Sequence, residues 1–304
     1  MFRIHLTEAG KEFKLSSVLK GNLGAFSAPR MRSFMRAPMP RAYSDYLGRL
    51  VFRFLVTLQG LGAFALITLG VIFTKWRLAQ SVTFPLIFKE LQRSGLRLIP
   101  MFCFMSGALG LVIIGQAVTR LSEVGAISSF LGTIMVTVVV RELGPLMTAM
   151  LVLSRSGTAN VIELGTARAL GEVEALEALG VDTVHYLVMP RVIGMALSVF
   201  ALTIYFIMGA LASGYLWAFL REVPLRPGEY FKQLADALDM MDFVILALKS
   251  TLFGVVIAIV TCYHGLAQPL SLEEISHATV RAVAQCIIAC VLLDALFIVI
   301  YLAI

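Results

Sequence analysis

Five apolar stretches, each long enough to cross a lipid bilayer as a helix, are the strongest constraint on how this chain can fold. They cover roughly residues 98–118, 130–153, 186–217, 243–264 and 283–304. A membrane-spanning helix needs about 20 consecutive apolar residues, and a water-soluble core would leave such segments exposed. Hydrophobic residues make up 59% of the 304 residues and charged residues 14%, whereas soluble domains carry about 25% charged residues. The sequence therefore predicts an all-α, multi-pass membrane protein.

A sixth apolar stretch, residues 54–74, is flanked by basic residues on both sides. Residues 1–53 contain ten Lys and Arg, and residues 75–97 contain five more. Basic flanks stay on the cytoplasmic side of a membrane, so a spanning helix here would carry one flank across. We therefore expect 54–74 to lie in the inner leaflet as an interfacial or elbow helix, within an elbow region of residues 54–97. Residues 1–53 are predicted to form a basic, cytoplasmic amino-terminal segment that contacts anionic headgroups.

The predicted topology follows by alternation from a cytoplasmic position at residue 97, and residues 98–304 form the transmembrane domain. The connections 119–129 and 218–242 are then outside, together with the carboxyl terminus, while 154–185 and 265–282 are inside.

Small residues recur at four-residue spacing within the apolar stretches. The pairs are Ser106/Gly110, Gly144/Thr148, Gly209/Ser213 and Ala210/Gly214. This spacing lets helix backbones approach closely, either within one chain or between two copies.

The stretch "VVVRELGPLMTAML", residues 138–151, carries two charges near the middle of a predicted span. Each charge costs about 2.5 to 3.5 kcal/mol at the centre of a membrane helix. Arg141 and Glu142 point about 100° apart and cannot simply neutralise each other. Pro145 has no N–H for the Arg141 carbonyl, so we expect a broken helix and a polar-walled cavity near the bilayer midplane. The alternative is a buried ion pair between helices.

Lys249 and Asp294 are the second set of intramembrane charges. They lie at depths of about 10 and 15 Å below the outer ends of successive helices, close enough to meet. Intramembrane charges usually pair and face the interior of the bundle. We predict a structural ion pair here and regard a proton relay as the alternative.

Residues 154–191 form the most polar connection between predicted spans. Within it, 161–179 is rich in helix formers and lacks proline, with Gly165 and Gly171 as mild defects. Gly180 is a predicted helix stop. Four acidic residues alternate with apolar ones: Glu163, Glu172, Glu174 and Glu177. An acidic helix binds an anionic membrane surface poorly, so a protein partner is favoured over a solvated helix on the inner leaflet.

Several chemistries lack their sequence signatures. The chain has no phosphate-binding loop of the type G-x-x-x-x-G-K-[ST]. It has no Ser/His/Asp or Cys/His set suited to covalent catalysis, and its four histidines and four cysteines lack the spacing of metal ligands. We therefore predict a protein that is not an enzyme, with no cofactor, no metal and no nucleic acid partner.

The motifs around these polar features resemble a known family. The segment "RELGPLMTAMLVLSRSGTANVIELGTARALGEVEALEALGVD", followed by "MPR", is similar to the signature of MlaE/YrbE-type permeases. These are the membrane subunits of ABC transporters that work with MCE-domain lipid carriers. The resemblance extends through "LKS" (248–250), "HGLAQPLSLEEISHATVRAV" (264–283) and "LLDALF" (292–297), and covers about residues 80 to 304.

The resemblance implies an assembly in the bacterial inner membrane. It implies a homodimer of permeases, each with an elbow helix and five spanning helices, with phospholipid between the two copies. Two cytoplasmic ABC ATPase subunits and an outer MCE-domain protein would be its partners, and a small STAS-domain subunit is a further partner that the family allows. The residues implied beside the lipid are Arg141, Glu142, Leu143 and Pro145. Residues 161–179 would be the cytoplasmic coupling helix, and the residues implied in ATPase contact are Glu163, Arg168, Glu172, Glu174 and Glu177.

The resulting prediction is a permease subunit that moves phospholipid, or a related lipid, between the inner membrane and an MCE-type carrier, for outer-membrane lipid homeostasis. A separate subunit would hydrolyse ATP. Two alternatives remain at this point: an ion-coupled secondary transporter or channel, and a membrane scaffold for an MCE assembly.

Overall fold

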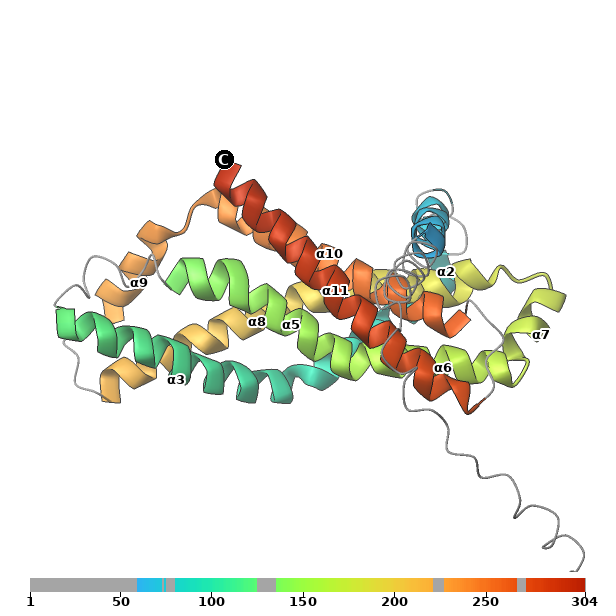
Figure 1. Cartoon of the computed structure of the whole chain (residues 1–304), viewed down its shortest axis with the longest axis horizontal. Coiled ribbons are helices and arrows are strands. Elements are labelled where there is room, and N and C mark those ends of the chain that lie inside the picture. The colour runs from blue at the N-terminus through green and yellow to red at the C-terminus, as the bar shows by residue number, and fades with distance from the viewer. Residues whose placement is uncertain are drawn as a thin grey trace, which may run out of the picture. The chain divides into compact units, whose positions relative to one another are not determined.

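The computed structural model describes residues 59–72, 74, 80–124, 135–220, 227–266 and 272–303. All of them fall in one of the two units of the chain, Val56–Ile304. The predicted basic segment 1–53 lies outside the described residues. Every regular element within the described ranges is a helix, which confirms the predicted all-α class (Figure 1).

Five helical segments are long and apolar enough to cross a membrane, as predicted. They are Phe84–Ala117, Val136–Ala169, Val184–Leu220, Met240–Leu266 and Glu274–Ala303. The first contains most of α2 (Gln80–Ser94), then η1 (Leu96–Leu98) and much of α3 (Ile99–Val124). The second joins η2 (Val136–Leu143), α5 (Gly144–Val152), η3 (Leu153–Gly157) and α6 (Thr158–Ala169), and the third joins η4 (Val184–Val188) and α8 (Met189–Leu220). The fourth and fifth are α10 and α11, and the short helices α7 (Glu172–Ala178) and α9 (Pro227–Ala237) lie in two of the connections.

The apolar stretch 54–74 contains a helix that is shorter than the five spans. It runs over Gln59–Ile72 and packs on the end of α10, where the rings of Phe64 and Tyr263 meet edge to face with centroids 5.8 Å apart. The predicted position of this helix in the inner leaflet stays a prediction.

The segment 161–179 is two helices, so the prediction of one continuous helix is wrong. The second spanning segment continues past residue 153 as far as Ala169, and α7 begins only at Glu172. Gly171 between them has a φ of +77°, a left-handed conformation that glycine adopts without steric cost. Gly180 also has a φ of +77°, and it ends α7 at the predicted stop. There the N–H groups of Gly180 and Val181 donate to the carbonyls of Glu177 and Leu176.

The small-residue pairs bring α3 and α8 together within the chain. A Cβ at Gly110 of α3 would collide with the backbone of Ala210 and the hydroxyl of Ser213 on α8. A Cβ at Gly209 would meet Ser106 in the same way. Helices in lipid associate through close packing, which small residues allow. The small residues therefore make the α3–α8 contact possible.

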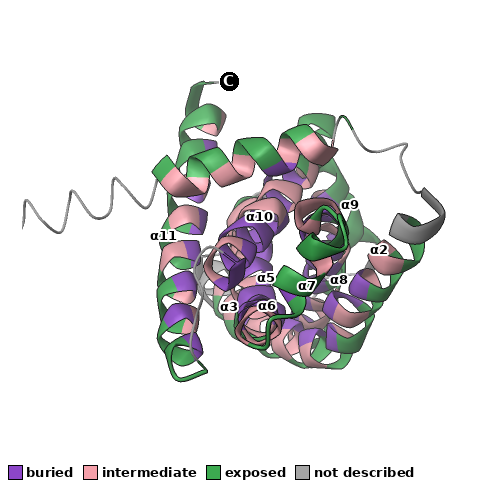
Figure 2. Cartoon of the chain, turned by 90° about the vertical axis from the view of Figure 1, so that its right-hand side faces the viewer, coloured by how far each residue is buried: buried purple, intermediate pink, exposed green. Residues whose placement is uncertain are grey.

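The buried core lies where α5, α8 and α10 face one another. Figure 2 shows buried residues concentrated on α5 and α10, while α11 presents exposed residues along its outer side. The core includes Val152 of α5, Val199 of α8 and Phe253 of α10, all fully buried. The outer side of α11 is apolar, with Val291 and Leu292 exposed, as expected for a helix that faces lipid. A second buried cluster contains Val139 and Val140 of η2 together with Ile207 of α8 and Leu246 of α10.

Replacing Gly110 by leucine should destabilise the protein by overpacking the α3–α8 contact. Such overpacking typically costs about 1 to 3 kcal/mol. Gly107→Leu is a matched control on the same helix, because a Cβ there meets nothing within 4 Å. Thermal unfolding of the detergent-purified variants should show a lower midpoint for Gly110→Leu alone. Equal midpoints would contradict the close α3–α8 contact.

Candidate functional site

Five charged residues and one tyrosine meet where η2 contacts α10 and α11. We call this set the charge network: Arg141 and Glu142 of η2, Asp242 and Lys249 of α10, and Asp294 and Tyr301 of α11. The two residues on α10 are seven positions apart, and so are the two on α11. Seven residues are about two helical turns, or about 10 Å, so each helix presents two polar groups on the same side. The network is therefore built in two layers.

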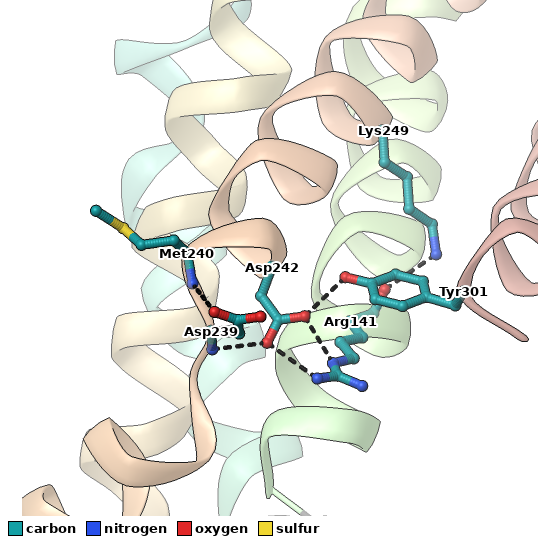
Figure 3. Close-up of polar contacts among 6 residues, drawn as sticks. All are labelled: Arg141, Asp239, Met240, Asp242, Lys249 and Tyr301. Carbon is teal, nitrogen blue, oxygen red and sulfur yellow. Dashed lines mark hydrogen bonds and ion pairs between the residues drawn. The ribbon is translucent and has the colours of Figure 1, made fainter. Parts of the chain in front are cut away.

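The first layer is centred on Asp242, at the end of the bundle that carries α9 and the carboxyl end of α11. Arg141 Nε lies 2.9 Å from Asp242 Oδ1, and Arg141 Nη2 donates to Oδ2 at 3.0 Å. The Tyr301 hydroxyl donates to Oδ1 at 3.0 Å, and the Asp239 N–H donates to Oδ2 at 3.1 Å. The Tyr301 ring also lies 5.0 Å from the Arg141 guanidinium carbon, within range of a cation–π contact. Figure 3 shows these groups converging on the Asp242 carboxylate from three directions.

The second layer is centred on Lys249. Its Nζ lies 2.6 Å from Asp294 Oδ1 and donates to Glu142 Oε2 at 3.0 Å. It also donates to the backbone carbonyl of Arg141 at 3.0 Å. The structure thus brings Lys249 and Asp294 together, as their depths predicted, and adds Glu142 to the pair.

The predicted helix break at Pro145 is wrong, because the backbone changes its hydrogen-bond spacing instead. Residues of η2 form a π-helix, in which the Gly144 N–H donates to the carbonyl of Val139, five residues back. Leu143 and Gly144 keep right-handed helical angles, and Pro145 lies at the start of α5, where a missing N–H is tolerated. Pro145 is buried and Leu143 half-buried. The Arg141 carbonyl, which Pro145 cannot serve in an α-helix, instead accepts from Lys249.

Exposure divides the network into fixed and accessible groups. The side chains of Lys249 and Asp242 are 1% and 3% exposed, so each is held inside the bundle with its partners. The side chains of Arg141 and Glu142 are 30% and 31% exposed. The charged groups of Arg141 and Glu142 therefore both reach the surface of the chain, while each remains bonded to a buried partner of opposite charge. Such an arrangement can offer one positive and one negative group to a polar ligand.

Asp242 and Tyr301 are the members of the network that the sequence did not single out. Asp242 was assigned to the connection 218–242, but α10 begins at Met240 and places it in the first helical turn. Tyr301 falls in the last turn of α11. The seven-residue spacing of Asp242 from Lys249 and of Tyr301 from Asp294 is the signal that could have found them.

α9 fixes the start of α10 next to this layer. The Tyr230 hydroxyl of α9 donates to the Leu211 carbonyl of α8 at 3.1 Å. Tyr230 is buried in this contact, and burial raises the pKa of its hydroxyl. This contact anchors α9 on α8, and α9 ends at Ala237, two residues before Asp239.

Two of the residues predicted to contact an ATPase, Glu163 and Arg168, are paired with other residues of the same chain. Glu163 of α6 pairs within the chain, with Arg93 of α2 at 2.5 Å and Arg191 of α8 at 3.3 Å. Arg168, near the end of α6, donates to the Leu266 carbonyl of α10 and lies 3.6 Å from Glu174. These contacts tie α6 to neighbouring helices of the same chain.

α7 carries the other three predicted residues on its surface. Val173 is buried in the core and anchors this short helix, while Glu172, Glu174 and Glu177 are exposed. Leu170 and Leu179, which flank α7, are 63% and 80% exposed. We call these five exposed residues the α7 surface. Its exposed leucines favour a protein contact over a solvated loop.

Replacing Lys249 by methionine should destabilise the protein strongly. Methionine keeps the volume but leaves Glu142, Asp294 and the Arg141 carbonyl without their donor, and removing one partner of a buried ion pair costs about 3 to 5 kcal/mol. Thermal unfolding should show a lower midpoint, partly restored by a second change, Asp294→Asn. Lys232→Met is the matched control, because Lys232 is exposed on α9. An unchanged midpoint for Lys249→Met would mean that the buried pair does not stabilise the fold.

Comparison with known proteins agrees with this architecture. The sequence pattern of the family described as "Permease MlaE" matches residues 87–300. A probable ABC transporter permease protein of Rickettsia bellii is 29% identical over 75% of this chain and 86% of its own length. A probable ABC transporter permease protein of Synechocystis is 31% identical over 60% of this chain and 69% of its own. The protein TRIGALACTOSYLDIACYLGLYCEROL 1, chloroplastic, of Arabidopsis thaliana is 26% identical over 68% of this chain and 58% of its own.

The family match covers three of the membrane-spanning segments completely and most of the first and the fifth, and it includes every member of the charge network except Tyr301, which lies one residue beyond it. The chain therefore belongs to the MlaE permease family and is an ABC transporter permease.

Proposed function

We propose that this chain is the permease subunit that moves phospholipid, or a related lipid, between a bacterial inner membrane and an MCE-type carrier. The observation that carries the proposal is the charge network, in which Arg141 and Glu142 stay accessible although they lie within a membrane-spanning segment. A guanidinium binds phosphate in a bidentate manner, and Glu142 is suited to an amine or hydroxyl of a headgroup. The name of the Arabidopsis relative contains that of a lipid, trigalactosyldiacylglycerol, which supports a lipid as cargo.

In this proposal the lipid lies beside Arg141, Glu142, Leu143 and Pro145, between two copies of the chain. The π-helical turn of η2 supports this location, since irregular helical turns occur frequently at functional sites. Movement of η2 and the start of α5 would open and close the site. Lys249 and Asp294 hold the site to α10 and α11 without contacting the lipid.

The energy for transport enters through the α7 surface, which we propose as the contact with a separate ATPase subunit. ABC transporter permeases work with ATPase partners, and the exposed acidic and apolar residues of α7 suit such a contact. Because α6 continues from η2 and α5 as one helical segment, a shift at α7 has a direct mechanical path to Arg141. The amino terminus and α7 would then face the cytoplasm, and an MCE-domain protein would meet the opposite face. A small STAS-domain subunit would bind on the cytoplasmic side.

Replacing both Arg141 and Glu142 by alanine should abolish lipid handling. The double variant, purified with its ATPase, should retain at least about tenfold less phospholipid, because the charge-assisted hydrogen bonds of the headgroup are lost. ATP-dependent lipid transfer from labelled vesicles should fall in parallel. Arg141→Lys with wild-type Glu142 should keep part of both activities. Intact transport in the double variant would show that the lipid site is elsewhere.

Changing Glu172, Glu174 and Glu177 together to lysine should release the ATPase. Reversal of three charges on the α7 surface replaces attraction by repulsion at the contact. The measurement is copurification of the ATPase with the tagged permease, and the control is the double variant Glu229→Lys/Asp236→Lys, which changes exposed acidic residues on α9 instead.

The two alternative functions predict other outcomes. Ion-driven uptake by the chain alone in vesicles, without an ATPase, would establish a secondary transporter. Lipid transfer that continues without ATP would favour a scaffold for the MCE assembly.

A further inference from the structure

Arg141 is the cation of the charge network that an incoming anionic group can reach. Lys249 is buried, and two carboxylates, those of Glu142 and Asp294, already share it. Arg141 is 30% exposed, and Asp242 is the carboxylate that it contacts. Across the network two cations face three carboxylates, so an anion finds no spare positive charge unless Arg141 leaves Asp242.

Asp242 is held in place independently of Arg141. The Tyr301 hydroxyl donates to its Oδ1 at 3.0 Å, and the Asp239 N–H donates to its Oδ2 at 3.1 Å. Each oxygen thus keeps one donor if the guanidinium departs. The usual penalty for leaving a buried carboxylate without a partner is reduced accordingly.

The backbone of Arg141 is held by its neighbours, while its side chain reaches the surface of the chain. Lys249 holds the Arg141 carbonyl, and the neighbouring Val140 is buried in a core cluster. The guanidinium lies at the end of a flexible chain, against the Tyr301 ring. Exchange of its partner can therefore occur by rotation of this side chain, which Figure 3 shows extending from η2 to Asp242.

We propose that Asp242 is a positioning residue that competes with the phosphate of a lipid headgroup for the guanidinium of Arg141. This inference rests on the proposed lipid site. Carboxylate and phosphate both accept two parallel hydrogen bonds from a guanidinium. Binding thus exchanges one ion pair of the guanidinium for another, which favours lipids that carry a phosphate and keeps their affinity low enough for release. Tyr301 tunes the exchange, because its hydroxyl stabilises Asp242 when Arg141 has left.

The test uses the full permease with its ATPase in vesicles of phosphatidylethanolamine and phosphatidylglycerol, with phosphate-free diacylglycerol as the comparison lipid. Asp242→Asn removes the competing charge and should raise phospholipid retention about tenfold, with slower ATP-driven release and unchanged diacylglycerol retention. Tyr301→Phe keeps the ring but removes one donor from Asp242, so that carboxylate should hold Arg141 more tightly. Phospholipid retention should then fall about three- to tenfold. A merely structural role would lower retention in both variants.

Equal or reduced phospholipid retention in a folded Asp242→Asn variant would overturn the inference, as would a parallel rise for diacylglycerol. If Asp242→Asn does not fold, Tyr301→Phe decides the question: a fall confined to phospholipid supports the inference, and retention that is unchanged, raised or lowered equally for diacylglycerol overturns it. Arg141→Ala separates the two proposals. If that variant retains normal phospholipid, the lipid site itself is wrong. If it loses phospholipid while Asp242→Asn gains none, the lipid site stands and Asp242 is no competitor.

Discussion

The buried ammonium of Lys249 is the group on which the arrangement of the other intramembrane polar groups depends. A charge inside a membrane protein is stable only with partners of opposite charge and a full set of hydrogen bonds. Lys249 has three acceptors: carboxylates from η2 and α11 and the backbone carbonyl of Arg141. A single side chain of α10 therefore joins three segments and also serves the carbonyl that Pro145 leaves without its α-helical donor.

This contact explains how Arg141 and Glu142 can stay accessible at their depth. Lys249 donates to the backbone carbonyl of Arg141. Each of the two side chains also keeps one buried partner, Asp242 for Arg141 and Lys249 for Glu142. The cost of both charges is offset inside the chain, so neither depends on a ligand for its stability. A site of this kind can be occupied and emptied repeatedly, as a transporter requires.

The helical segment that begins with η2 is followed, after Ala169, by the α7 surface, whose chemistry differs from that of the charge network. Gly171 turns the chain sharply after α6, and α7 presents three glutamates and two leucines around one buried anchor, Val173. Glu163 and Arg168, by contrast, bond to α2, α8 and α10 of the same chain. They connect α6 to the bundle, while the α7 surface is available to a partner. The proposed coupling therefore runs from the α7 surface across the turn at Gly171 and then along one helical segment, Val136–Ala169, to the charge network.

The spans could be predicted from the sequence because they depend on local composition. An apolar run of about 20 residues forms a helix in lipid whatever its neighbours are, since its backbone groups must bond within the segment. The depth of Lys249 and Asp294 was likewise enough to suggest that they meet. The division at Gly171 and the π-helical turn at Pro145 could not be predicted, because several backbone geometries satisfy the same residues and packing selects among them. Asp242 and Tyr301 were missed because each lies at a helix end, where composition does not distinguish a solvated residue from a buried one.

By itself, the sequence determined the membrane class, the number of spans and the presence of charges that must face protein, because the hydrocarbon of a bilayer imposes those constraints on each segment separately. Only the tertiary structure decided which charges are partners. The pairing of Arg141 with Asp242 and of Glu142 with Lys249 depends on how η2, α10 and α11 are rotated against one another. η2 packs with α8 and α10 in one buried cluster, and α5, α8 and α10 share the main core, so these pairings rest on contacts between residues far apart in the chain.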